Sequence, residues 1–191
     1  MSNKEDLRVR RTKKALFTAF FEMVESNTID EITINELCEA AGIRRATFYK
    51  HYSDKYDFLT AYIRHLRDRF DASMKRSGAD ALTKEYYVAY AKRIVTFVNE
   101  NETAVDNIFK SNLFPTVMYA IVEQNYKDTI ERLKISVSEG MQLNGSVEVV
   151  AGMCAGGVGS AIYHWIVSGK KISADELADQ IGAVVSAAIG E

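Results

Sequence analysis

The fold is decided by the stretch Ala41-Gly42-Ile43-Arg44-Arg45-Ala46-Thr47-Phe48-Tyr49-Lys50-His51-Tyr52. Gly42 has the conformational freedom that a sharp turn after a helix requires. Phe48 and Tyr52 lie one helical turn apart, so they give the segment after the turn one apolar face. Upstream, Thr33-Ile34-Asn35-Glu36 has the pattern of a capping box and predicts the start of a short helix. The stretch therefore predicts two short helices joined by a glycine turn.

A longer helix is predicted on each side of this pair. Over residues 12–25, apolar residues recur every three or four positions, as in an amphipathic helix. Ser53 is predicted to cap a long helix, with Asp54 and Asp57 at its positive end. A long helix followed by two short ones matches the helix-turn-helix layout, in which the second short helix enters the DNA major groove. Donors suited to base edges and phosphates remain on its other faces: Arg44, Arg45, Thr47, Tyr49, Lys50 and His51.

The rest of the chain also has a helical pattern. The 191 residues include one proline, and the sole Asn-Gly pair, Asn144-Gly145, lacks the flanking alternation of a hairpin. Helices are expected near residues 83–100, 103–111, 114–138, 146–168 and 173–189. We predict an all-α protein with an N-terminal three-helix helix-turn-helix domain and a C-terminal helical domain.

Charge is distributed unevenly along the chain. Residues 1–76 hold 15 Lys+Arg and 12 Asp+Glu, a balance of +3, whereas residues 77–191 hold 9 and 14, a balance of -5. Ser77-Gly78-Ala79-Asp80 is the best break in the helical pattern. We therefore expect a DNA-binding domain over residues 1–76, including its long linking helix, and a second domain over residues 77–191.

The segment from Thr33 to Leu59 resembles the TetR family of bacterial transcriptional regulators. The resemblance rests on Ala41-Gly42-Ile43, on Thr47-Phe48-Tyr49-Lys50-His51-Tyr52 and on Asp54-Lys55. The paired arginines and the Asp-Lys-Tyr segment are also similar to the subset typified by dihydroxyacetone-kinase regulators. The resemblance implies an operator-binding regulator, a homodimeric repressor that a small molecule releases from double-stranded DNA.

The resemblance also implies individual roles. Arg44 stands where members usually have a capping Ser, so this helix start loses a cap worth ~1 kcal/mol, and we expect Arg44 to bind phosphate or a base instead. Base edges are assigned to Arg45 and Thr47, and phosphates to Thr33, Tyr49, His51 and Lys55.

The C-terminal domain is expected to provide the dimer interface and a ligand site. A dimer with two DNA-binding domains recognises twice the number of base pairs that one domain does. The last two helices are the predicted dimer interface. Small residues recur there at Gly152, Gly156, Gly159 and Ser160, which lets a second helix approach closely. Four side chains that bring a polar atom into an apolar region are the ligand-binding candidates: Tyr90, Tyr119, His164 and Trp165. The sequence does not identify the ligand, and a regulator without an inducer remains the alternative.

Other functions have weaker support. A helical small-molecule-processing enzyme is disfavoured because the chain lacks the common catalytic motifs, and we predict no cofactor. Its three histidines are too scattered for a metal site. The net charge of -2 argues against a protein that coats DNA without regard to sequence. The uncharged stretch from Val149 to Gly169 contains too many glycines and polar groups to insert alone, so we expect a buried helix in a cytoplasmic protein and no membrane partner.

Two further features have competing interpretations. Cys38 and Cys154 are expected to be buried thiols rather than redox sensors. Five cations close to the N-terminus form either a solvated tail or a segment that follows DNA phosphates: Arg8, Arg10, Arg11, Lys13 and Lys14.

Overall fold

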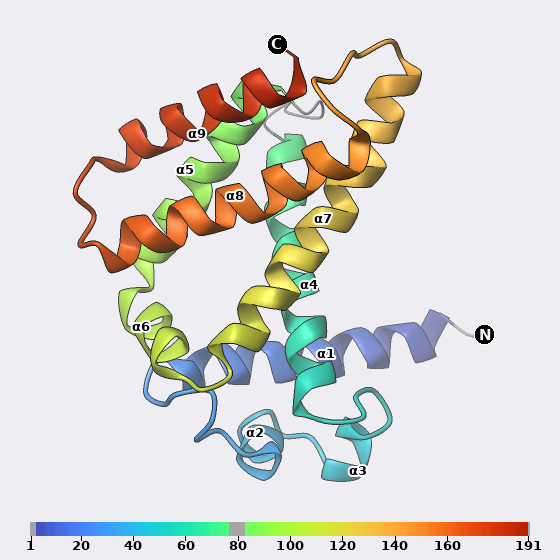
Figure 1. Cartoon of the computed structure of the whole chain (residues 1–191). Helices are drawn as coiled ribbons and strands as arrows, with labels where there is room; N and C mark the ends of the chain where they lie inside the picture. The colour runs from blue at the N-terminus through green and yellow to red at the C-terminus, as the bar shows by residue number, and fades with distance from the viewer. Residues whose placement is uncertain (1–2, 77–82, 191) are drawn as a thin grey trace. The chain divides into compact units, whose positions relative to one another are not determined.

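The computed structural model describes residues 3–76 and 83–190, and within these ranges it is helical without strands (Figure 1). The all-α prediction is confirmed. The chain divides into two compact units, which are described separately. Unit 1 comprises residues 1–63 and 101–118, and unit 2 comprises residues 64–100 and 119–191.

Unit 1 contains the helix-turn-helix. Figure 1 shows the two short helices α2 and α3 following α1 at one end of this unit. The helices of unit 1 are α1 (Asn3–Val24), α2 (Ile34–Ala40), α3 (Arg45–Phe48), the first part of α4 (Lys55–Arg76), α6 (Glu102–Lys110) and the first residues of α7 (Phe114–Ser138).

Helix α1 begins earlier than the apolar pattern predicted. It starts at Asn3 rather than near residue 12. The cations from Arg8 to Lys14 therefore belong to a helix and not to a tail, and their side chains are exposed.

The N-terminal cap of α2 is as predicted, and that of α4 is not. The capping box of α2 is confirmed: the Thr33 hydroxyl accepts from the Glu36 N–H, and the Glu36 carboxylate accepts from the Thr33 N–H. Helix α4 is capped one residue later than predicted. The Asp54 carboxylate accepts from the Asp57 N–H at 2.8 Å, while the Ser53 N–H donates to the Asp57 carboxylate at 2.9 Å. A carboxylate at this position also interacts favourably with the helix dipole.

An aromatic cluster fills the centre of unit 1. Phe48 is fully buried at the end of α3, and its ring centroid lies 5.3 Å from that of Tyr52 and 5.7 Å from that of Phe58 on α4. Helix α1 contributes Phe17 and Phe20, whose rings also contact Phe58. Tilted and edge-to-face rings at such separations stabilise packing beyond their buried area. The cluster joins α1, α3 and α4.

Helix α6 belongs with the DNA-binding unit, which the predicted division at residue 76 did not anticipate. The Asn107 side chain donates to the carbonyl oxygen of Val24, the last residue of α1, at 2.9 Å. The Asn112 N–H donates to the Asp30 carboxylate at 2.9 Å. These bonds connect residues more than 80 positions apart, so charge along the chain does not reveal them. The predicted break at Ser77-Gly78-Ala79-Asp80 lies outside the described residues.

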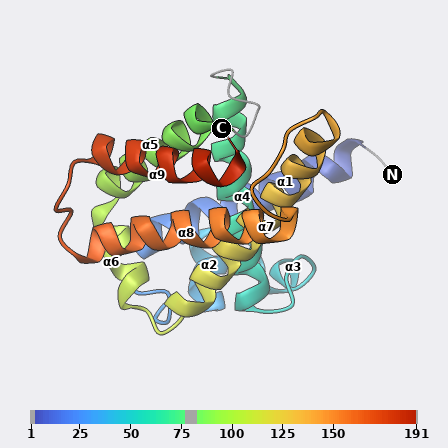
Figure 2. The ribbon, with the colours of Figure 1, turned by 45° about the horizontal axis from the view of Figure 1, so that its top comes forward.

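Unit 2 is a bundle built around α5 (Lys84–Glu100), α8 (Val147–Val167) and α9 (Ala174–Ile189), together with the remaining parts of α4 and α7. Figures 1 and 2 show α5, α8 and α9 side by side. Their core includes Tyr86, Ala91 and Val95 of α5 and Ala178 of α9. The Trp165 indole N–H donates to the Ile172 carbonyl oxygen at 2.8 Å and fixes the turn between α8 and α9.

Helix α8 is long and apolar enough to cross a membrane by length and composition. One side of it forms part of the core of unit 2 through Val150, Ala151, Cys154 and Val158. Its apolar composition is therefore explained by packing, as for a core helix of a folded domain.

The Tyr52 hydroxyl gives the first prediction. It is buried and has no hydrogen-bond partner among the described residues, and burial raises the pKa of Tyr52 to about 12. A buried polar group without a partner costs about 1–3 kcal/mol. We expect Tyr52→Phe to raise the free energy of unfolding by about 1 kcal/mol in a denaturant titration.

Tyr49→Phe is the matched control because the Tyr49 ring is 44% exposed. We expect this variant to unfold within about 0.5 kcal/mol of the wild type. A Tyr52→Phe protein less stable than the wild type would show that the hydroxyl contributes to folding.

Candidate nucleic-acid interface

A tight turn sets the direction in which α3 leaves α2. Gly42 has φ of +65°, a conformation that favours glycine, and the Ile43 N–H donates to the Cys38 carbonyl oxygen at 2.8 Å. Arg44 then occupies the N-cap with an extended backbone and no side-chain hydrogen bond to the helix. The predicted loss of a side-chain cap is confirmed.

Helix α3 and the four residues after it divide into a buried and an exposed side. Phe48 and Tyr52 face inward with exposures of 0% and 3%. The side chains predicted to read DNA lie outside this core. Arg44, Arg45, Tyr49 and Lys50 are exposed, and Thr47 and His51 are half-buried.

Arg45 and Tyr49 interact across one turn of this surface. The Arg45 guanidinium donates to the Tyr49 hydroxyl at 3.4 Å and lies 5.5 Å from the centre of its ring. The hydrogen bond and the charge interaction with Tyr49 raise the pKa of Arg45. A cation held over an aromatic ring has fewer conformations to lose on binding. The contact therefore restrains a side chain suited to guanine recognition.

His51 lies in a positive environment. Burial, Lys13 of α1 and Lys50 together lower the pKa of His51 below 6.5. The imidazole is therefore mostly neutral at pH 7, and it presents one N–H donor rather than a full charge. The influence of Lys13 indicates that α1 adds positive potential beside α3.

The Thr33 N–H and hydroxyl, which were predicted to bind phosphate, are already bonded to Glu36. Both donate to the Glu36 carboxylate, at 2.9 Å and 2.7 Å. These bonds lower the pKa of Glu36. A phosphate at Thr33 has to displace a carboxylate, so the geometry does not favour a direct contact.

Lys55 was also predicted to bind phosphate, but its ammonium is directed into the protein. It donates to the carbonyl oxygens of Ile29 and Ile32, the latter at 2.5 Å, and it lies 3.3 Å from that of Asp30. Burial lowers the pKa of Lys55, although Asp30 and Glu36 oppose this effect. The three N–H donors of a lysine are thus directed to the connection between α1 and α2. We assign Lys55 a structural role.

Two family models match the chain. Residues 85–187, more than half of the sequence, match the C-terminal region of a transcriptional regulator. Residues 22–62, which include α2, α3 and the start of α4, match the bacterial regulatory proteins of the tetR family. The chain belongs to the TetR family. It is a DNA-binding transcriptional regulator, and the members of this family are regulators rather than enzymes.

A curated relative matches the chain over a short segment. The uncharacterized HTH-type transcriptional regulator YxbF of Bacillus subtilis (strain 168) is 42% identical over 59 residues, which cover 30% of this chain and 16% of YxbF. The match thus spans about a sixth of the length of that relative.

Two solved structures have the same fold over nearly the whole chain. The regulator FadR of Bacillus subtilis, in complex with stearoyl-CoA, aligns with 91% of this chain and 97% of its own, with a TM-score of 0.63 and 13% identity. The dihydroxyacetone kinase operon activator DhaS aligns with 94% and 96%, with a TM-score of 0.59 and 17% identity. At these identities the similarity shows the fold.

The four residues predicted to bind a ligand do not form one site. Tyr90 lines a small cavity inside unit 2. His164 and Trp165 line a separate surface groove of about 460 Å³ at the end of α8. Tyr119 is 70% exposed and lines neither space.

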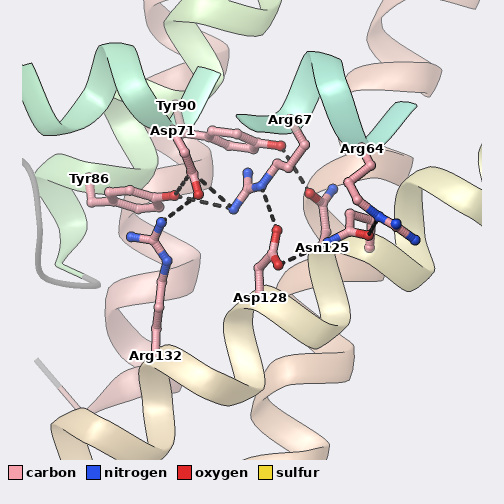
Figure 3. Close-up of polar contacts among 9 residues, drawn as sticks. Arg64, Arg67, Asp71, Tyr86, Tyr90, Asn125, Asp128 and Arg132 are labelled. Carbon is pink, nitrogen blue, oxygen red and sulfur yellow. Dashed lines mark hydrogen bonds and ion pairs between the residues drawn. The ribbon is translucent and has the colours of Figure 1, made fainter. Parts of the chain in front are cut away.

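The cavity beside Tyr90 contains a polar network that the sequence did not reveal. Figure 3 shows Arg67 of α4 among acidic side chains from two helices. Arg67 pairs with Asp128 of α7 at 3.0 Å and with Asp71 at 3.5 Å. The i,i+4 spacing of Arg67 and Asp71 is a signal in the sequence, but the partners on α7 lie about 60 positions away.

Histidine, cysteine, aspartate and glutamate side chains are the candidates for metal binding, and the two cysteines are the candidates for a reactive thiol. Among the described residues, no group of three His, Cys, Asp or Glu side chains is placed to hold a metal ion. Cys38 and Cys154 are buried free thiols, and burial raises the pKa of both. A thiol that stays protonated is a poor nucleophile.

Lys55 and Lys50 provide a matched pair of tests. Lys55→Met removes the donor to three carbonyl oxygens, so we expect it to lower the free energy of unfolding by about 1–2 kcal/mol. We expect the salt dependence of DNA binding to keep its slope. Lys50→Met, at an exposed cation, should leave unfolding unchanged and reduce the slope by about 1.

The two measurements are a denaturant titration and DNA binding at several salt concentrations. A Lys55→Met protein of normal stability with a reduced slope would return Lys55 to the phosphate contacts.

Proposed function

We propose that this TetR-family protein is a cytoplasmic homodimeric repressor that binds operator DNA through α3 and is released by a small molecule. The observation that carries the proposal is the division of residues 44–52, which include α3, into a buried aromatic side and an exposed cationic side. Packing fixes the helix, and its remaining donors are free to meet base edges and phosphates.

The proposed contacts follow from exposure and chemistry. Arg45 and Thr47 contact base edges, with Arg45 suited to the O6 and N7 atoms of guanine. Tyr49 and His51 donate to phosphates. Lys50 and Arg44 add exposed charge, which strengthens binding to any sequence. Thr33 and Lys55 support the geometry of this surface instead of contacting DNA.

The proposed dimer interface lies on the uncovered side of α8 and α9. Val149, Met153 and Val167 of α8 are more than half exposed, and Val184 of α9 is 70% exposed. Large apolar side chains gathered on one exposed face are typical of a protein interface. A symmetric pair of such faces allows two copies to bind operator half-sites together.

The glycines of α8 support the same interface. A Cβ atom added at Gly156, Gly157 or Gly159 would meet nothing within 4 Å, so packing within this chain does not require glycine there. Glycine in a helix interior costs about 1 kcal/mol relative to alanine. Close approach of a second α8 would account for small residues at these positions.

Ligand control is proposed to act through α4. This helix begins at Lys55 in unit 1 and carries Arg67, which lines the cavity of unit 2. A ligand that binds the DNA-competent and incompetent conformations unequally by about 5.5 kcal/mol changes their ratio from 1:99 to 99:1. DhaS is described as an operon activator, so a reporter assay decides between repression and activation. Expression that rises when the gene is deleted supports a repressor.

The base-reading role is tested with Arg45→Ala. We expect the variant to lose preference at one base pair of the operator, at a cost of about 1–3 kcal/mol. The measurement is selection of bound fragments from random DNA, followed by titration of single-base variants. Lys127→Ala, an exposed cation on α7, is the control and should keep the wild-type preference. An unaltered preference in Arg45→Ala would exclude this role.

The interface is tested with Met153→Glu, at a side chain that is 62% exposed. We expect a dimer for the wild type and a monomer for the variant in sedimentation at micromolar concentration, because two charges would be buried across the two-fold axis. Ile135→Glu is the matched control, since Ile135 is 58% exposed but belongs to α7 and not to α8 or α9. A monomeric wild type, or dissociation in both variants, would contradict the proposal.

A further inference from the structure

Two of the proposed DNA contacts, Arg45 and Tyr49, touch each other one helical turn apart. The Tyr49 N–H donates to the Arg45 carbonyl oxygen at 3.1 Å, so the helical backbone fixes their spacing. The Arg45 Nη2 atom donates to the Tyr49 hydroxyl oxygen at 3.4 Å, and the Arg45 Cζ atom lies 5.5 Å from the centre of the ring. The ring and the hydroxyl of Tyr49 therefore both act on one guanidinium.

The Tyr49 ring is in turn oriented from the core of unit 1. The Phe48 ring, which is fully buried, meets the Tyr49 ring edge to face, with centroids 5.4 Å apart and planes inclined at 85°. This arrangement is one of the preferred geometries of an aromatic pair. Tyr49 is 44% exposed, so one part of the side chain packs on Phe48 while another part reaches solvent. Packing of the core thus extends through Tyr49 to Arg45.

The partner of Arg45 leaves its charge available. Arg67 and Arg132 of unit 2 donate to aspartate carboxylates, which neutralise their charge. Arg45 instead donates to a neutral hydroxyl on the surface. A guanidinium has more N–H donors than this one bond requires, and the remaining donors can form the paired contact that guanine accepts. Arg45 can therefore keep its bond to Tyr49 while it reads a base.

The Tyr49 hydroxyl can form a second hydrogen bond at the same time. A phenol hydroxyl that accepts one hydrogen bond still has its own hydrogen to donate. Phosphate oxygens of DNA commonly accept from tyrosine hydroxyls. Hydrogen bonds in a chain polarise and strengthen one another. A phosphate bound to Tyr49 would therefore strengthen the bond between Tyr49 and Arg45.

We propose that Tyr49 is a positioning residue that couples one DNA phosphate to the guanine preference of Arg45. The Tyr49 hydroxyl donates to the phosphate and accepts from Arg45, whose other donors meet the O6 and N7 atoms of the base. The inference rests on the proposed function, in which Arg45 reads a base and Tyr49 contacts phosphate. It adds that Tyr49 determines specificity as well as affinity, although it touches no base itself.

Substitutions of Tyr49 test the coupling from the side of the protein. The DNA is the fragment that the wild type selects from random sequence, and Arg45→Ala identifies the base pair that Arg45 reads. We expect Tyr49→Phe to reduce the preference at this base pair about five-fold, because one hydrogen bond to Arg45 is lost. Tyr49→Leu also removes the ring, so we expect a loss of about ten- to twenty-fold.

Three readouts separate positioning from a general structural effect. Preferences at the other base pairs and the slope of the salt dependence should stay as in the wild type, because Tyr49 carries no charge. Denaturant titration checks that both variants are folded. Tyr119→Phe, at a tyrosine of α7 that is 70% exposed, is the matched control and should keep the wild-type preference.

Neutral phosphates test the coupling from the side of the DNA. Methylphosphonates, which lack the phosphate charge, replace one phosphate of the selected fragment at a time. We expect one position at which this replacement lowers both the affinity of the wild type and its preference at the base pair read by Arg45. In Tyr49→Phe the same replacement should leave the preference unchanged, because the hydroxyl that connects phosphate and guanidinium is absent.

Three outcomes would overturn the inference. An unchanged preference in Tyr49→Phe and Tyr49→Leu would show that Arg45 is positioned without Tyr49, and an increased preference would show that Tyr49 holds Arg45 away from the base. A wild-type preference that no methylphosphonate alters would exclude the coupling to phosphate. In each case the proposed function stands as long as Arg45→Ala loses its preference, whereas an unaltered Arg45→Ala protein contradicts the proposed base contact itself.

Discussion

The burial of Phe48 is the constraint on which the DNA-binding surface depends. Helix α3 has four residues and no side-chain cap, so it is too short to be stable by itself. It is held because the Phe48 ring contacts Tyr52 and Phe58 within the aromatic cluster of unit 1. Because Phe48 and Tyr52 are held in the core, Tyr49 and Lys50 between them face outward. Recognition thus depends on packing that does not itself contact DNA.

Burial also separates cations that look equivalent in the sequence. Arg45 of α3 and Lys50, two residues after this helix, are exposed, and a positive charge there attracts phosphate. Lys55 donates to backbone carbonyl oxygens inside the protein, and Arg67 donates to aspartate carboxylates. The first pair is proposed to contact DNA, and the second pair holds segments of the protein together. The same kind of charge therefore has opposite functions in the two environments.

Helix α4 contributes residues to both units. Its first residue supports the turn that precedes α2, and Arg67, three turns later, lines the cavity of unit 2. A ligand that alters the surroundings of Arg67 acts on the same helix that Lys55 anchors in unit 1. The proposed ligand control would run along this helix, which is continuous from Lys55 to Arg76.

The capping box at Thr33, the turn at Gly42, the order of the helices and the family could all be predicted from the sequence, because these signals depend on residues a few positions apart. The place of α6 in unit 1 and the inward direction of the Lys55 ammonium follow from contacts between distant residues. The same is true of the cavity that Tyr87 and Arg67 share. Such partners lie tens of residues apart along the chain, and a local pattern carries no information on which distant side chain will fill the space opposite.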